Sequence, residues 1–287
     1  MSRADKRPPR LEPRVSASRP APPPTLEVSL EQAKVAGAGA PGPGPTEFRR
    51  TVERLVAGDR RALGDLAPMT GIAIDDAWAA VAGTFGAAPT RPVIDPACTV
   101  GATRAARARV SAVAATGARV AIAAAAPASL LTLHLAFAGL VRAHGGELVD
   151  LADLGPIRAD GRSPRWLRWV GGVAVVSDGD ALCATRDGEV AREWIFAIPR
   201  PTLVIADGPF AEVAWESGIE VVAFAGLDRP GLAIAAVRGG LATVVPMRTD
   251  RPARAYRGLE ELLTCGSNAP DGPSAPGSAG GPRVTEL

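Results

Sequence analysis

From residue 118 onward the chain alternates short apolar runs with segments of helical periodicity, and this rhythm restricts the fold more than any other feature of the sequence. One helical segment, ASLLTLHLAFAGLVRA at 128–143, follows Pro127 and stops before Gly145. Alternating strands and helices predict an α/β fold in three layers, with a mainly parallel sheet flanked by helices. The runs that we interpret as strands are ARVAIAAA (118–125), GELVDLA (146–152), TLVIADG (202–208), EVVAFAG (220–226) and ATVVPM (242–247).

Residues 26–117 carry a different pattern, which predicts a mostly helical N-terminal part. Apolar side chains recur there every three or four residues, as on one face of a helix. Together with the sheet core over 118–265, these helices are expected to form a single domain over 26–265. The predicted helices of the N-terminal part span 46–65, 75–86 and 96–115.

The segment RWLRWVGGVAVVSDGDALCAT at 165–185 interrupts the alternation with a predicted β-hairpin. Asp178-Gly179 favours a tight type I′ turn, so we place the turn there and expect an insertion or an antiparallel edge of the sheet. The same residues superficially match the strand and Asp-x-Asp pattern of enzymes that form an aspartyl phosphate. Such enzymes use a catalytic lysine, and the only lysines of this chain are Lys6 and Lys34.

Two terminal segments, 1–25 and 266–287, are rich in Pro, Arg, Gly and Ser and cannot bury much apolar surface. We expect both to be disordered. The segment AGAGAPGPGP contains Gly-x-Gly-x-x-Gly at 37–42, the spacing of a dinucleotide-binding fingerprint. No predicted strand precedes it, and its prolines prevent a helix from starting at the third glycine, so we expect no dinucleotide site.

Composition and charge argue against several classes of function. A net charge of +2 creates no strong field for nucleic acid or for an anionic membrane surface. No apolar run approaches the roughly 20 residues that cross a bilayer, so neither nucleic acid nor membrane is an expected partner. With three cysteines, no CxxC pair and two histidines, the sequence predicts neither a zinc site nor a disulfide framework. A reducing cytoplasm is the expected location.

The ligand site of an open α/β sheet lies beyond the carboxyl ends of its strands, and Asp207-Gly208-Pro209 occupies such a position. Gly208 lets a ligand approach the backbone, and Pro209 presets the first turn of the next helix. The N–H groups of Gly208 and Phe210 would then attract an anion. Asp207 would bind a metal ion or act as a general acid or base; the alternative is that it only caps the helix.

The next predicted strand ends in a similar pattern, Asp228-Arg229. If the connecting helix makes the usual right-handed crossover, the two strands are neighbours, and Asp207 and Asp228 share one edge of the sheet. Arg229 would bind a phosphate or a carboxylate; the alternative is a solvent-exposed turn. Arg248 and Asp250, after the last strand, would complete the pocket.

Several segments, taken in order, resemble an actinobacterial family described as "phosphatase", over about residues 26–265. The resemblance implies hydrolysis of a phosphomonoester, with carboxylates that hold a divalent metal ion, Mg²⁺ or Mn²⁺, and a helix N-terminus that binds the phosphate. It rests on LEQAKVAGAGAPGPGPTEFRR, RLVAGDRRALG, VIDPACT, RWVGGVAVVSDGDAL, TLVIADGPFAEVAWESGIEVVAFAGLDRPGLAIA and VVPMRTDRPARAY.

The chain resembles a divergent member, because the histidines of the family's motifs are replaced. If those histidines bind metal or transfer protons, catalysis is lost, and the alternative function is that of a binding or regulatory module. The family tends to show Thr-Gly-His-Pro, Asp-His-Gly-Phe, His-Thr-His and Asp-Asp-Asn patterns, which correspond here to 124–127, 207–210, 184–186 and 248–250.

The strand ends and the resemblance together imply a small phosphorylated molecule as the ligand. The aspartates of the family's motifs carry over to this chain. The expected roles are catalysis for Asp207 and Asp228, metal binding for Asp207, Asp228 and Asp250, and phosphate binding for Gly208, Phe210, Arg229 and Arg248.

Overall fold

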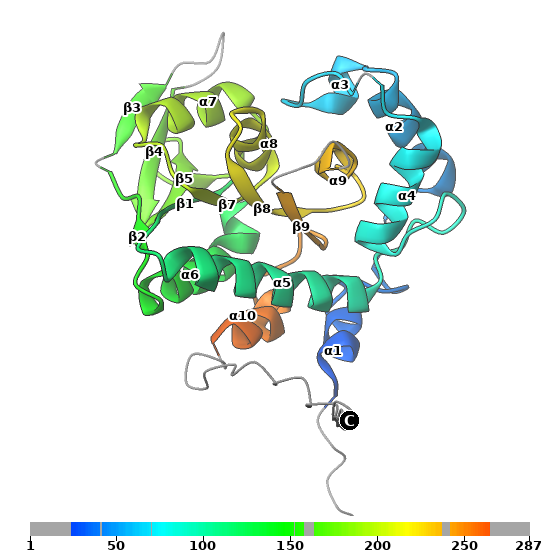
Figure 1. Ribbon diagram of the computed structural model, residues 1–287, viewed down its shortest axis with the longest axis horizontal. Coiled ribbons are helices and arrows are strands. Elements are labelled where there is room, and N and C mark those ends of the chain that lie inside the picture. The colour runs from blue at the N-terminus through cyan, green and yellow to red at the C-terminus, as the bar shows by residue number, and fades with distance from the viewer. Residues whose placement is uncertain are drawn as a thin grey trace, which may run out of the picture.

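A central sheet lies between two layers of helices, as the alternation predicted (Figure 1). The segments predicted to be disordered, 1–25 and 266–287, lie outside the described residues apart from Pro24 and Thr25. The computed structural model describes residues 24–40, 42–69, 71–151, 153–157, 164–236 and 242–264.

Parallel strands form the centre of the sheet, and each pairs with its neighbour in continuous register. Every connection between them passes through at least one helix, which is the requirement for parallel neighbours. In spatial order the parallel strands are β5 (Val173–Ser177), β1 (Arg119–Ala124), β7 (Leu203–Asp207), β8 (Glu220–Ala225) and β9 (Ala242–Pro246).

Antiparallel strands extend the sheet beyond β5. The predicted hairpin is present at this edge. Its longer pair of strands, over 165–170 and 173–177, is joined by Gly171-Gly172, so the turn predicted at Asp178-Gly179 was wrong for this pair. Gly171 and Gly172 have φ values of +59° and +85°, which residues with a side chain rarely adopt. Asp178-Gly179 lies in the turn that follows β5. The strands of this edge are β3 (Leu154–Ile157), β4 (Arg165–Val170) and β6 (Leu182–Cys183).

One face of the sheet is covered by a layer of helices that lies below it in Figure 1. In this layer the two long helices pack on the sheet, and the shorter ones pack against them. Across the described residues, no helix has the length and hydropathy needed to cross a membrane. The helices of this layer are α1 (Leu26–Gln32), α5 (Pro96–Ala114), α6 (Pro127–Ala143) and α10 (Arg257–Thr264).

The opposite face is covered by α7 (Gly188–Ala197) and α8 (Gly208–Glu216). Four further helices extend this layer past the β9 end of the sheet and belong to the same hydrophobic core (Figure 1). They are α2 (Pro45–Val56), α3 (Arg60–Leu63), α4 (Ile74–Phe85) and α9 (Gly231–Ala235).

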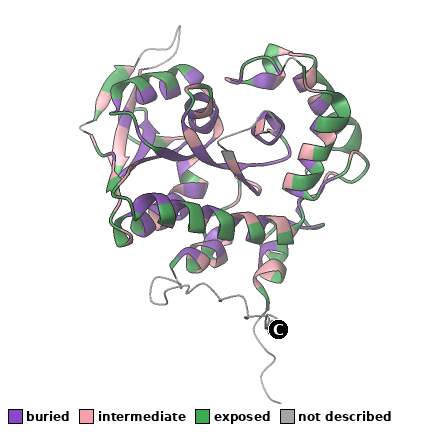
Figure 2. Cartoon of the chain, viewed as in Figure 1, coloured by how far each residue is buried: buried purple, intermediate pink, exposed green. Residues whose placement is uncertain are grey.

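The central strands are buried on both faces, which is why they appear in the sequence as continuous apolar runs (Figure 2). Successive side chains point to opposite faces. In β1, Ala121 and Ala123 contribute to the core between the sheet and helices α7 and α8. Val120 and Ile122 contribute to the core between the sheet and helices α5 and α6. Small side chains on the first face allow α8 to pack close to the sheet.

Three local predictions differ from the structure. The helix predicted over 46–65 is interrupted, because Gly58 has a φ of +76° and the Asp59 carboxylate accepts the Arg61 N–H to start a new helix, α3. The strand predicted over 146–152 is reduced to the two residues of β2 (Glu147–Leu148). Helices α1, α7, α9 and α10 were not predicted.

Replacing Phe224 by alanine should lower the free energy of unfolding by about 3–5 kcal/mol, as for other large-to-small core substitutions. Phe224 is 2% exposed, and its ring centroid lies 5.7 Å from that of Phe137. Urea denaturation measures the change. Phe196→Ala is the control, since Phe196 is 81% exposed and should change stability by less than about 0.5 kcal/mol. A cost below about 1 kcal/mol for Phe224→Ala would contradict the position of β8.

Candidate functional site

A cavity of about 300 Å³ opens at the C-terminal edge of the sheet, beyond β1, β7 and β8. This is the position at which open α/β sheets bind ligands. Adjacent parallel strands end there, so residues that follow different strands converge on one space. Of the residues selected from the sequence, those that line this cavity are Asp207, Gly208, Asp228, Arg229 and Asp250.

Asp207 is almost fully buried at this edge, with an exposed fraction of 3%. Its Oδ1 accepts a hydrogen bond from the Ala125 N–H at 2.8 Å, and its Oδ2 accepts one from the Ala126 N–H at 3.0 Å. Asp207 stands at the N-cap position of α8, yet its side chain makes no capping hydrogen bond there. It satisfies instead the backbone at the start of α6, the neighbouring helix. Both carboxylate oxygens are therefore engaged by the backbone.

His134 lies beneath the cavity and faces the same carboxylate. Its Nε2 is 3.5 Å from Asp207 Oδ1, and its Nδ1 is 2.8 Å from the Leu130 carbonyl oxygen. Burial lowers the pKa of His134 and raises the pKa of Asp207, because neither charged form is solvated there. His134 is not among the residues that line the cavity, so it supports Asp207 from below and does not meet a ligand.

Gly208 forms the wall of the cavity at the start of α8. Its φ is +55°, and an added Cβ would lie 3.0 Å from the Cβ of Ala125. Both facts favour glycine, and the backbone is accessible beside the cavity. Phe210 does not line the cavity: its side chain is fully buried, and its ring centroid lies 5.2 Å from that of Trp194.

Asp228 and Arg229 follow β8 and differ in their contacts. Asp228 is exposed, and its carboxylate makes no hydrogen bond or ion pair with the described part of the chain. Arg229 has a side chain that is 33% exposed, and its Nη1 lies 3.4 Å from Glu212 Oε1. A guanidinium group has five N–H donors, so this single contact leaves donors without a partner among the described residues, in a side chain that lines the cavity.

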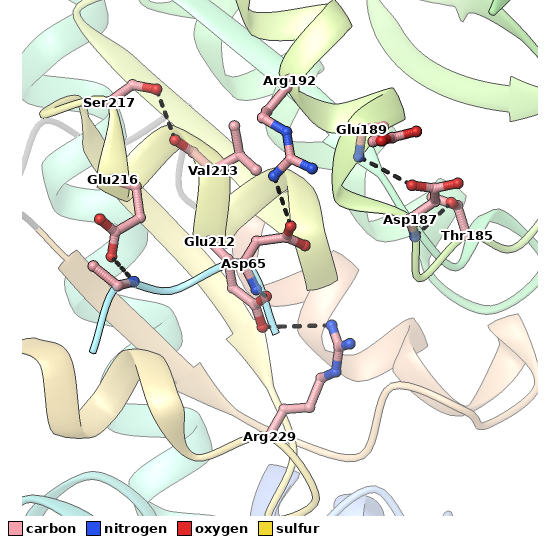
Figure 3. Close-up of polar contacts among 11 residues, drawn as sticks. Asp65, Thr185, Asp187, Glu189, Arg192, Glu212, Val213, Glu216, Ser217 and Arg229 are labelled. Carbon is pink, nitrogen blue, oxygen red and sulfur yellow. Dashed lines mark hydrogen bonds and ion pairs between the residues drawn. The ribbon is translucent and has the colours of Figure 1, made fainter. Parts of the chain in front are cut away.

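Glu212 is a residue of the site that the sequence analysis missed. It is 5% exposed, and its Oε2 accepts the Asp65 N–H at 3.1 Å. Figure 3 shows the Arg229 guanidinium directed at Glu212, with the Asp65 segment beside it and Arg192 paired to the Asp65 carboxylate. Burial raises the pKa of Glu212, and the charge of Arg229 partly opposes that shift. The available signal was an acidic residue between the apolar residues Ala211 and Val213 in the predicted helix after Asp207.

A second cavity of about 370 Å³ adjoins the first and contains Arg248 in its wall. The Arg248 guanidinium is paired with Asp250, which also accepts from Arg251 at 3.0 Å. These two arginines hold the pKa of Asp250 well below its usual range. Asp250 is thus neutralised by the protein itself.

Arg186 lines both cavities and was not among the predicted site residues. It is exposed, and it makes no hydrogen bond or ion pair with the residues that the structure describes. Its loop is held to the end of β1, where the Thr185 N–H donates to the Ala125 carbonyl oxygen at 2.9 Å. The sequence signal was an arginine within the 184–186 segment, where the phosphatase-like family tends to have histidine.

The carboxylates of this edge do not fit the divalent metal ion expected from the sequence. Of the three aspartates predicted to bind a metal, Asp207 is bonded to two backbone N–H groups and Asp250 to two arginines. Asp228 alone of the three has no partner in the described part of the chain. Within the described ranges, no group of three or more His, Cys, Asp or Glu side chains is arranged to hold a metal ion. Mg²⁺ and Mn²⁺ need several oxygen ligands, so we assign no chemical step to a metal here.

Comparison with known proteins gives two matches. A family model described as Phosphatase matches residues 25–265. A protein of Streptomyces coelicolor (strain ATCC BAA-471 / A3(2) / M145) named Phosphatase SCO2771 is 28% identical over 159 residues, which are 54% of this chain and 59% of that protein. The alignment thus spans less than two thirds of that relative. No solved structure matches the chain.

Asp207→Asn should lower the free energy of unfolding by about 1–3 kcal/mol, because an amide offers one oxygen and leaves one of the two backbone N–H groups without an acceptor. Asp228→Asn is the matched control and should change stability by less than about 0.5 kcal/mol, since Asp228 is exposed. Urea denaturation of both variants makes the comparison. A neutral effect of Asp207→Asn would show that those N–H groups have another acceptor.

Glu212 should make stability depend on pH in a direction set by its burial. The ordinary pKa of this side chain is 4.5, and the folded chain raises it. As the pH rises above 4.5, the unfolded chain loses this proton before the folded chain does, so the folded state becomes less stable. The free energy of unfolding of the wild type minus that of Glu212→Gln should therefore fall from pH 4.5 toward neutrality. A difference that grows over the same range would mean that Arg229 outweighs burial.

Proposed function

The chain belongs to the family described as Phosphatase, and on that premise we propose that it binds the phosphate group of a small phosphomonoester at the C-terminal edge of its sheet. The observation that carries this proposal is a pair of guanidinium groups, Arg186 and Arg229, which come from separate loops and line one cavity. Gly208, at the N-terminus of α8, completes the wall beside them.

The chemistry of these groups suits a phosphate ester. A phosphoryl group carries a charge of about −1.5 to −2 at neutral pH and presents three acceptor oxygens. Guanidinium groups match such oxygens with paired N–H donors and remain charged at all ordinary pH values. The N-terminus of α8 adds partial positive charge near Gly208.

Metal-assisted hydrolysis, the activity expected from the sequence, needs carboxylates that are free to bind a metal or to attack. Asp207 is held by Ala125 and Ala126, and Asp250 is held by Arg248 and Arg251. The geometry therefore favours phosphate-ester binding without metal-assisted carboxylate chemistry, which is the role of a binding or regulatory module with a phosphatase-like fold.

Titration calorimetry of the full chain with inorganic phosphate and with phenyl phosphate, in buffer that contains EDTA, tests the binding site. The wild type should bind both, and Arg229→Ala should weaken binding by about tenfold or more, because hydrogen bonds to charged groups contribute about 1.5–3 kcal/mol. Arg168→Ala is the matched control. Arg168 also pairs with a carboxylate, that of Asp153, but it lies on β4 and lines neither this cavity nor the one beside it.

The same titrations with Mg²⁺ or Mn²⁺, together with an assay of phosphate release from phenyl phosphate, test the role of a metal. Affinity should be equal with and without metal, and metal should not stimulate release. Metal-dependent hydrolysis that Asp228→Asn abolishes would overturn the proposal in favour of the mechanism expected from the sequence. Failure of the wild type to bind either phosphate compound would also overturn it.

A further inference from the structure

We propose that the ligand is a sugar phosphate or another polyol phosphate, whose hydroxyl groups are recognised in the second cavity. The inference rests on the proposed function and specifies the part of the ligand beyond its phosphate. The two cavities, of about 300 and 370 Å³, adjoin and together have the size of a small-ligand site. The lining residues that they share are Arg186, Gly226, Asp228, Thr249 and Asp250.

Glu47 forms the wall of the second cavity on the side of the N-terminal helical part. It lies in the first turn of α2, is exposed, and its carboxylate makes no hydrogen bond or ion pair within the described ranges. Asp228 lines both cavities, and its carboxylate also makes no hydrogen bond or ion pair with the described residues. Ionised carboxylates only accept hydrogen bonds, so these two residues match a ligand that presents several donors.

The remaining groups of the second cavity favour neutral donors over a cation. Arg248 is paired with Asp250, and the guanidinium of Arg186 offsets part of the charge of Glu47 and Asp228. Within the described residues, no group of three or more His, Cys, Asp or Glu side chains is arranged to hold a metal ion. Ile94 and Leu227 add apolar surface, against which the C–H groups of a sugar ring can pack. Hydroxyl groups on a small carbon skeleton satisfy all three conditions, with the phosphate placed in the first cavity near Arg229.

Titration calorimetry with inorganic phosphate, phenyl phosphate and ribose 5-phosphate separates phosphate recognition from hydroxyl recognition. The wild type should bind ribose 5-phosphate at least about tenfold more tightly than phenyl phosphate, since hydrogen bonds to charged acceptors are strong. Glu47→Ala should remove most of that preference and leave the affinity for inorganic phosphate unchanged. Glu53→Ala, an equal charge change at an exposed residue of α2 that lines neither cavity, should alter neither affinity.

The outcomes distinguish this inference from the proposed function. If the wild type binds inorganic phosphate but does not prefer ribose 5-phosphate, the inference is overturned and the proposed function stands. The same conclusion follows if Glu47→Ala weakens the binding of inorganic phosphate and ribose 5-phosphate equally. If inorganic phosphate does not bind, both are overturned. Thermal unfolding of the Glu47→Ala variant shows whether it is folded under the conditions of the titration.

Discussion

The hydrogen bonds that Asp207 accepts connect the two strands beside which the candidate site lies. Without this carboxylate, the N–H groups of Ala125 and Ala126 would lose the acceptors that the described structure gives them, at the point where the chain turns from β1 into α6. Asp207 supplies both acceptors from the end of β7, although burying a charge is unfavourable in itself. The floor of the cavity depends on this side chain, which is why its oxygens have little capacity for a ligand.

The other polar side chains at this edge also differ in whether the protein itself already satisfies their hydrogen bonds. Glu212 and Asp250 are held by partners from the protein itself, whereas Arg186 and Asp228 face the cavities without a partner among the described residues. A group whose hydrogen bonds are already satisfied gains little from a ligand. The recognition of an anion and of hydroxyl groups that we propose therefore rests on the side chains without a partner, and not on all of the aspartates for which the sequence predicted metal binding.

The strands at this edge, and the pairing of β7 with β8, could be predicted because they follow from local rules: apolar runs, helical periodicity and right-handed crossovers. The contacts that the side chains of the site make could not be predicted from the sequence. Asp207 bonds a residue 82 positions away and Glu212 one 147 positions away, and neither contact leaves a local signature. At the β-hairpin the sequence offers two turn signals, Gly171-Gly172 and Asp178-Gly179, and pattern alone did not show that both are used.

Glu212 has one oxygen on the backbone of Asp65, in the segment after α3, and the other near the guanidinium of Arg229. A phosphate that attracts Arg229 competes directly with Glu212 for that charge. The docking of the N-terminal segment and the occupancy of the sheet edge then share one carboxylate and are thermodynamically linked. Linkage of this kind is reciprocal, so docking of the segment around Asp65 changes ligand affinity by the same factor by which the bound ligand changes the docking equilibrium of that segment.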